Sequence, residues 1–135
     1  MWGGIVEATV KPDQLTLYEE RNAEFWDVRS RQAGFLSEPE FDTNDGRSMA
    51  IVLWERHAAQ QVARPALIEV IDRIQPLLAI PLQVPGTGEI VTEGFVSGAG
   101  FAVVVEVVVA PEEETAIQEA LQAFRVVRAQ QPGFH

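Results

Sequence analysis

The pattern of apolar and polar residues at the start of the chain predicts a strand followed by an amphipathic helix. The β-branched stretch GIVEATV, residues 4–10, has the composition of a strand, and Pro12 with Asp13 provides a helix start. We expect this helix to run to about residue 32, because Gly34 supplies a stop. Its apolar residues recur at a period near 3.6 and fall roughly on one side: Leu15, Tyr18, Phe25, Trp26 and Val28.

The residues after Gly34 predict a hairpin, a broken helix and one more strand. FLSEPEFDT, residues 35–43, reads as an edge strand because Pro39 cannot donate to a ladder, and NDG at 44–46 is a hairpin turn before a return strand over 48–55. The helical pattern that follows is expected in two pieces, 57–63 and a second piece that begins at Pro65. After Pro81 and Pro85, EIVTEGFVS at 89–97 is the last predicted strand of the unit.

The chain also contains an internal repeat. Sliding the sequence by 99 positions aligns residues 6–36 with 105–135 without a gap, and 12 of the 31 pairs are identical. Average residue usage gives about two identities by chance. The second copy predicts a strand over 101–109 and a helix with an apolar stripe formed by Ile117, Ala120, Leu121, Phe124 and Val127. We therefore expect one full unit and the first third of a second, which is either shortened or completed by strands of another molecule.

The order of these elements, β-α-β-β-α-β followed by β-α, indicates a ferredoxin-like fold of the α+β class. In this split βαβ arrangement an antiparallel four-stranded sheet carries both helices on one face. Two domains are predicted, the full unit over residues 1–98 and the partial repeat over 101–135. The open sheet face and the apolar residues on both faces of the strand at 101–109 predict a homodimer or a higher oligomer.

Composition and charge narrow the class of protein. The 135 residues are 47% apolar, which suits a packed core, and the chain has no Cys for disulfides or thiolate chemistry. With 20 acidic and 10 basic residues, the net charge of −10 disfavours nucleic acid and anionic membranes as partners. The N-terminus lacks the features of a signal peptide and no apolar run reaches membrane-spanning length, so we expect a cytoplasmic protein.

Several stretches resemble the antibiotic-biosynthesis monooxygenase family of dimeric α+β-barrel proteins. They are RQAGFLS at 31–37, the NDG turn, the strand that ends in LWER, the helix after Pro65, and QQPGFH at 130–135. The resemblance implies a cavity between sheet and helices, or a barrel interior, that holds a small aromatic or polyketide-like substrate. Some relatives oxidise anthrone-like phenols with molecular oxygen and without a cofactor. The alternative is a member of the same fold that binds a small molecule or serves assembly without catalysis.

The implied reaction needs an aromatic wall and a positioned base or polar anchor. Trp54 stands where the family usually has a Trp, and it is either a substrate-binding wall or an aromatic core residue. Trp54 shares a strand face with Ser48, Ala50 and Val52, and the other face carries the apolar residues Met49, Ile51 and Leu53. We therefore expect Trp54 to point away from the helices. Glu7, repeated as Glu106, is a catalytic base if it faces an apolar cavity, or an edge charge if it faces solvent.

His57, three residues after Trp54, is the second candidate base, and the alternative is a helix cap or a surface residue. Trp26 and Arg29 are further candidates for substrate binding, and Arg47 for lining or gating a pocket. Alternatively, Trp26 packs under the sheet, and the two arginines are solvated or pair with nearby carboxylates. Haem-degrading relatives carry Asn on the first strand, where this chain has Glu7, and Trp and His on the second long helix, where residues 62–78 include neither. Haem breakdown is therefore not expected. No residue cluster has metal-ligand spacing, so neither a cofactor nor a metal is expected.

Overall fold

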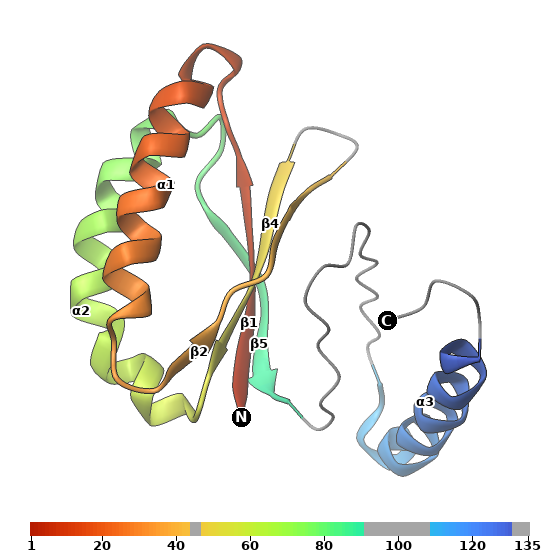
Figure 1. Cartoon of the computed structure of the whole chain (residues 1–135). Coiled ribbons are helices and arrows are strands. Elements are labelled where there is room, and N and C mark those ends of the chain that lie inside the picture. The colour runs from red at the N-terminus through yellow and green to blue at the C-terminus, as the bar shows by residue number, and fades with distance from the viewer. Residues whose placement is uncertain (44–46, 91–108, 131–135) are drawn as a thin grey trace. The chain divides into compact units, whose positions relative to one another are not determined.

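Two helices lie side by side on one face of an antiparallel sheet in the computed structural model of the chain (Figure 1). The structure describes residues 1–43, 47–90 and 109–130. The chain divides into two units, Met1–Thr92 and Glu93–His135, and each is described by itself. The predicted turn at 44–46 and residues 101–108 of the predicted strand lie outside the described residues.

The sheet of the first unit confirms the predicted βαββαβ order. Its strands are β1 (Trp2–Thr9), β2 (Phe35–Ser37), β3 (Glu40–Asp42), β4 (Arg47–Trp54) and β5 (Gln83–Glu89). The order across the sheet is β2-β4-β1-β5, and β3 pairs with β4 along the same edge as β2. The predicted edge strand is therefore interrupted near Pro39, whose carbonyl accepts a hydrogen bond from the Ile51 amide at 2.9 Å.

The last strand lies earlier in the chain than predicted, over Gln83–Glu89 instead of 89–97. The sequence analysis did not identify this strand, because Pro and Gly are poor strand formers and QVPGTGE contains one Pro and two Gly. An edge strand tolerates both, and the register between β1 and β5 shifts between Ile5 and Glu7, beside Pro85. Residues 91–97 of the predicted strand lie outside the described residues.

The two helices are α1 (Leu15–Ser30), after a 3-10 turn at Pro12–Gln14, and α2 (His57–Ile74), before a 3-10 turn at Gln75–Leu77. The predicted break in the second helix is wrong, since α2 runs through Pro65 without interruption. A proline removes one amide donor from the helix, but the buried side of α2 spans both sides of it, with Ala63 before and Val70 and Ile74 after. Packing of this continuous side holds the helix together.

The chain turns from α1 into β2 at Gly34, which has a φ of +81°. This left-handed conformation favours glycine, and a Cβ at this position would lie 2.6 Å from the Cβ of Ala59 in α2. The carbonyl of Gly34 accepts a hydrogen bond from the Glu55 amide at 2.8 Å. The predicted helix stop is thus confirmed, and the turn at Gly34 lies against the residues that join β4 to α2.

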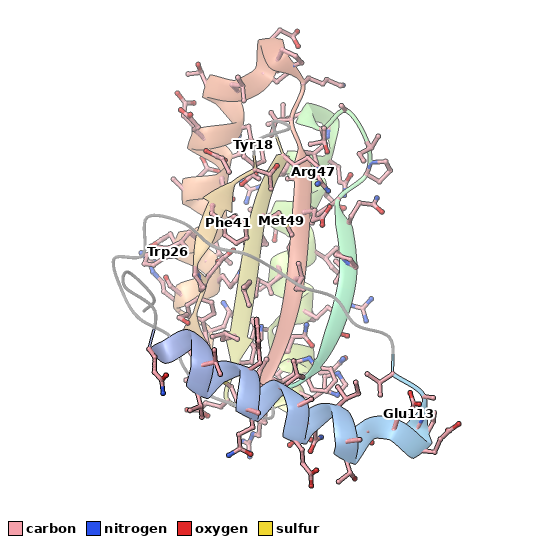
Figure 2. The ribbon with its side chains drawn as sticks, turned by 90° about the vertical axis from the view of Figure 1, so that its right-hand side faces the viewer. Tyr18, Trp26, Phe41, Arg47, Met49 and Glu113 are labelled. Carbon is pink, nitrogen blue, oxygen red and sulfur yellow. The ribbon has the colours of Figure 1, made fainter. Side chains whose placement is uncertain are left out.

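The core lies between the sheet and the two helices. Ala8 of β1 packs there with Tyr18 and Phe25 of α1 and with Val70 and Ile74 of α2. A second cluster joins Trp54 and Val52 of β4 to Ala63 of α2. The predicted direction of Trp54 is therefore wrong, because the face of β4 that carries Val52 and Trp54 is the one that meets the helices. The opposite sheet face carries Met49, with Phe41 and Arg47 (Figure 2).

The described part of the second unit consists of a 3-10 turn at Pro111–Glu113 and α3 (Glu114–Ala129). The predicted second helix is confirmed. Both elements begin and end 99 residues after the turn at Pro12–Gln14 and α1, in agreement with the repeat in the sequence.

Candidate functional site

A large cavity with a volume of about 450 Å³ lies between the sheet and the helices of the first unit. Volumes of this size suit small organic ligands. Strand residues form one wall: Gly4, Val6, Val52, Trp54, Val84 and Thr87. Helix residues and Leu82 form the rest: Phe25, Arg29, His57, Gln60, Gln61, Arg64, Leu67, Ile68 and Ile71.

One side of α2 gives this cavity a polar end and an apolar end. His57, Gln60, Gln61 and Arg64 occupy its first two turns, and Leu67, Ile68 and Ile71 the turns that follow. Residues three or four apart lie on the same side of a helix, so a single helical stripe changes from polar to apolar along its length. A ligand with one polar and one aromatic end matches this gradient.

Trp54 and His57 both line the cavity, and each ring packs on another aromatic side chain. Trp54 is only 1% exposed and meets Phe35 edge to face, with 5.6 Å between the ring centroids. His57 is exposed; its ring stacks on Trp2 at a centroid distance of 4.2 Å, and its Nε2 lies 2.7 Å from Nε2 of Gln61. Trp54 therefore contributes to the cavity wall while it is mainly a core residue, and His57 is held beside the cavity with access to water.

Arg29 is the buried cation of the cavity. It is 3% exposed, its guanidinium lies 3.8 Å from the centroid of the Phe25 ring, and its Nη1 donates to Oε1 of Glu38. Burial lowers the pKa of the Arg29 guanidinium and the Glu38 charge opposes this shift. Burial likewise raises the pKa of the Glu38 carboxyl, and Arg29 opposes it. Among the described residues, Arg29 Nε and Glu38 Oε2 have no hydrogen-bond partner.

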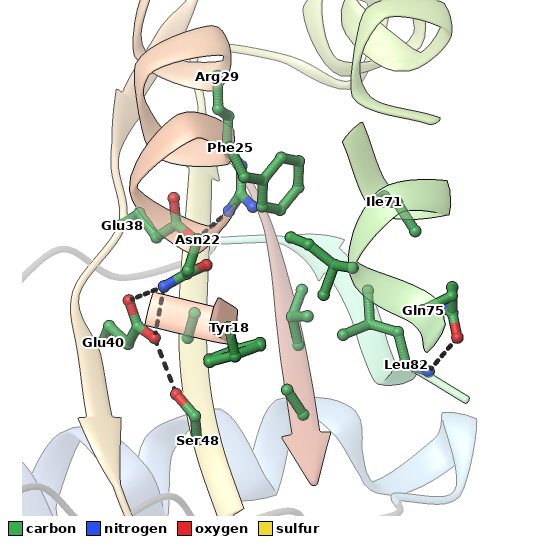
Figure 3. Close-up of a pocket in the computed structure, with 14 residues that line it drawn as sticks. Tyr18, Asn22, Phe25, Arg29, Glu38, Glu40, Ser48, Ile71, Gln75 and Leu82 are labelled. Carbon is green, nitrogen blue, oxygen red and sulfur yellow. Dashed lines mark hydrogen bonds and ion pairs between the residues drawn. The ribbon is translucent and has the colours of Figure 1, made fainter. Parts of the chain in front are cut away.

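Phe25 and Arg29 also border a smaller polar chamber of about 30 Å³, shown in Figure 3. Tyr18, Glu38 and Glu40 line it, with Asn22 and Ser48, which both donate to Glu40. Burial, followed by the charge of Glu40, raises the pKa of Tyr18 to about 12. This volume suits one or two water molecules between polar groups, so the chamber has room for solvent but not for an organic ligand.

Two of the predicted site residues lie away from the large cavity. Glu7 follows Val6 in β1, and because neighbouring strand residues point to opposite faces, Glu7 lies on the sheet face away from the cavity. There its Oε2 accepts a hydrogen bond from Nη1 of Arg47 at 2.8 Å. Trp26 is 53% exposed and is not among the residues that line the cavity, so it does not pack under the sheet. The structure thus brings together Trp54, His57 and Arg29 and separates Glu7 and Trp26 from them.

Sequence reasoning missed Gln60, Gln61, Arg64 and Glu38. The first three follow His57 at helical spacing and precede Pro65, so this signal was already present in the sequence. Nothing in the sequence pairs Glu38 with Arg29, because their contact depends on how the chain turns at Gly34.

The described residues contain no group of three or more His, Cys, Asp or Glu side chains placed to hold a metal ion. In the same part of the chain, no helix combines the length and the apolar character that crossing a membrane requires.

Several solved structures superpose on about two thirds of the chain. An antibiotic biosynthesis monooxygenase superposes with a TM-score of 0.60 at 16% identity, over 68% of this chain and 100% of the other. Rv0793 from Mycobacterium tuberculosis gives 0.62 at 15% identity, over 70% and 98%. SnoaB, a cofactor-independent oxygenase from Streptomyces nogalater, gives 0.59 at 19% identity, over 68% and 94%.

No protein-family model and no curated protein sequence matches the chain. At identities of this size the superpositions show the fold alone. The resemblance seen in the sequence is confirmed at that level: the first unit has the ferredoxin-like α+β fold of the antibiotic biosynthesis monooxygenase structures.

Proposed function

We propose that the protein oxidises a small aromatic or polyketide-like phenol in the large cavity, with molecular oxygen and without a cofactor. The observation that carries the proposal is the cavity itself, whose apolar walls enclose a buried guanidinium and meet a histidine at one end. The cofactor-independent oxygenase SnoaB has the same fold and supports the same reaction class.

The residues of the cavity suit the steps of such a reaction. His57 would take a proton from the substrate, and the Arg29 guanidinium would stabilise the negative charge that this step leaves on the substrate oxygen. The resulting carbanion adds oxygen to form a hydroperoxide, which loses water to leave a carbonyl. For an anthrone, the methylene carbon gains one oxygen atom, the other leaves as water, and the substrate supplies all the electrons.

Oxygen uptake by metal-stripped, flavin-free protein tests the proposal with 1,8-dihydroxyanthrone as substrate. We expect saturable uptake above the spontaneous rate and a fall of roughly 100-fold in kcat/KM for His57→Gln, the usual size of a general-base contribution. Glu7→Gln is the matched control, since it removes the other candidate base on the opposite sheet face. A large loss in Glu7→Gln with none in His57→Gln would place the chemistry outside this cavity.

A non-catalytic binding protein of the same fold is the second candidate. The exposure of His57, Gln61 and Arg64 favours it, because oxidation through a carbanion needs the exclusion of water. Binding of a hydroxyanthraquinone without oxygen uptake from any anthrone would support this candidate over the enzyme.

We also propose a homodimer. Ile5 and Ile51 lie opposite each other on the sheet face away from the helices and are only half-buried, which is consistent with a partner on this face. Size-exclusion chromatography with light scattering should give at least twice the mass of 14.9 kDa, and a monomer at micromolar concentration would contradict the proposal.

A further inference from the structure

The large cavity has a charge opposite to that of the chain. The sequence has 20 acidic and 10 basic residues, yet no Asp or Glu is among the described residues that line this cavity, whereas Arg29 and Arg64 are. The acidic side chains gather in the other hollows of the first unit, where Glu38, Glu40, Glu19 and Asp42 lie. Composition alone would predict the reverse, so the local excess of cationic groups points to the ligand.

Of the two arginines among the described residues that line the cavity, Arg29 pairs with Glu38 and Arg64 is the one without a counter-charge. In the described part of the chain, its guanidinium takes part in no ion pair or hydrogen bond, although it lies on the cavity side of α2. Other arginines of the unit contact carboxylates: Arg21, Arg29, Arg31, Arg47 and Arg73. A guanidinium is always charged and presents a planar fork that fits a carboxylate with two hydrogen bonds.

We infer that the cavity binds an aromatic acid, with its carboxylate on Arg64 and its ring system at the apolar end. Gln60 and Gln61 lie on the same side of α2 and offer amide donors to the same group. The inference deepens the proposed function by naming the substrate class, but binding requires no chemistry.

The position of Arg29 fixes which end of the ligand is charged. Its guanidinium already contacts the Glu38 carboxylate, so a second full negative charge gains less there than at Arg64. Its Nε has no partner among the described residues and suits a carbonyl or phenol oxygen on the ring system, which is neutral in the bound ligand and becomes charged only during the proposed reaction. The ligand therefore carries its acid towards the start of α2 and an oxygen substituent towards α1.

Isothermal titration calorimetry with two matched probes tests this inference. Anthraquinone-2-carboxylate and anthraquinone-2-carboxamide have the same ring system, and neither has the methylene that oxidation requires. At neutral pH and low salt we expect the acid to bind about tenfold more tightly than the amide, the size of a charge-assisted pair. Arg64→Gln should abolish this ratio and leave the affinity for the amide unchanged.

Arg73→Gln is the matched control, because Arg73 lies on the same helix, lies 3.6 Å from Glu24 and does not line the cavity. It should retain the tenfold preference. Equal affinities of the two probes, a preference that survives in Arg64→Gln, or no binding of either probe would each overturn the inference. Oxygen uptake from a neutral anthrone, together with equal affinities of the two probes, would retain the proposed oxidation and reject the aromatic acid as ligand. Acid-selective binding without oxygen uptake would retain the aromatic acid as ligand and reject the proposed oxidation.

Discussion

The helices that begin the two copies of the repeat have the same local structure and different burial. Both follow a 3-10 turn whose last amide donates at 2.9 Å to the carbonyl of the residue before the turn, and both are 16 residues long. In α1, Phe25 is 7% exposed, whereas its counterpart Phe124 in α3 is 55% exposed. Local sequence is thus sufficient to place a helix, but burial of its apolar side requires a surface to pack on.

The comparison also shows which apolar residues of α1 are core residues. Four positions that stay apolar or identical in the second copy are buried or half-buried in α1, namely Tyr18, Phe25, Val28 and Arg29, but Leu17 also stays apolar and is exposed. Apolar positions that become charged are exposed in α1: Leu15 is 51% exposed and Glu114 replaces it, and Trp26 is 53% exposed and Arg125 replaces it. A charged residue in the second copy therefore marks an apolar residue of α1 that lies outside the core.

The largest expected effect comes from truncating the two equivalent phenylalanines. Phe25→Ala should lower the free energy of unfolding by about 3–5 kcal/mol, because it opens a hole in the core and removes the ring beneath Arg29. Phe124→Ala should cost less than about 1 kcal/mol, since more than half of that side chain is already exposed. Urea unfolding followed by circular dichroism measures both, and equal losses would show that the two helices are equally packed.

An intermediate effect is expected at alkaline pH from Tyr18, whose counterpart Ile117 cannot titrate. The folded pKa of Tyr18, about 12, lies above the ordinary value of 10.0, so folding favours the protonated phenol. This contribution is fully present below pH 10 and is lost as the pH rises towards 12, by roughly 2–3 kcal/mol.

Tyr18 is the only Tyr in the chain, so the absorbance of tyrosinate reports its titration directly. Tyr18→Phe should remove this part of the alkaline loss of stability and leave the part due to other groups. A titration midpoint near pH 10 in the folded protein would contradict the burial of the phenol described above.

The smallest effect is expected where α1 and α3 differ in the sequence. Trp26→Arg and Leu15→Glu give α1 the residues of the second copy at exposed positions, and each should change the free energy of unfolding by less than about 0.5 kcal/mol. A matched change at the buried position, Phe25→Arg, should prevent stable folding. A loss above about 2 kcal/mol for Trp26→Arg would mean that this indole is covered, for example by a partner molecule.

Much of the fold could be predicted from the sequence because the signals are local. The 99-residue repeat, the helix starts at Pro12 and Pro111 and the order of the elements all depend on neighbours along the chain. The sequence also named Trp54, His57 and Arg29 as candidate site residues, and all three line one cavity in the structure. Their shared cavity was suggested by the resemblance to known proteins and lies where the resemblance implied.

Only the tertiary structure decided which face of the sheet the helices cover. Alternation assigns Glu7 and Trp54 to faces but cannot say which face meets the helices, and here Trp54 faces α2 while Glu7 lies on the other side with Arg47. The continuity of α2 through Pro65 and the strand at Gln83–Glu89 were likewise set by packing and by pairing with β1, which outweigh the local preferences of Pro and Gly. The pairing of Arg29 with Glu38 and the cationic lining around Arg64 depend on contacts between separate elements, and no local pattern in the chain specifies these.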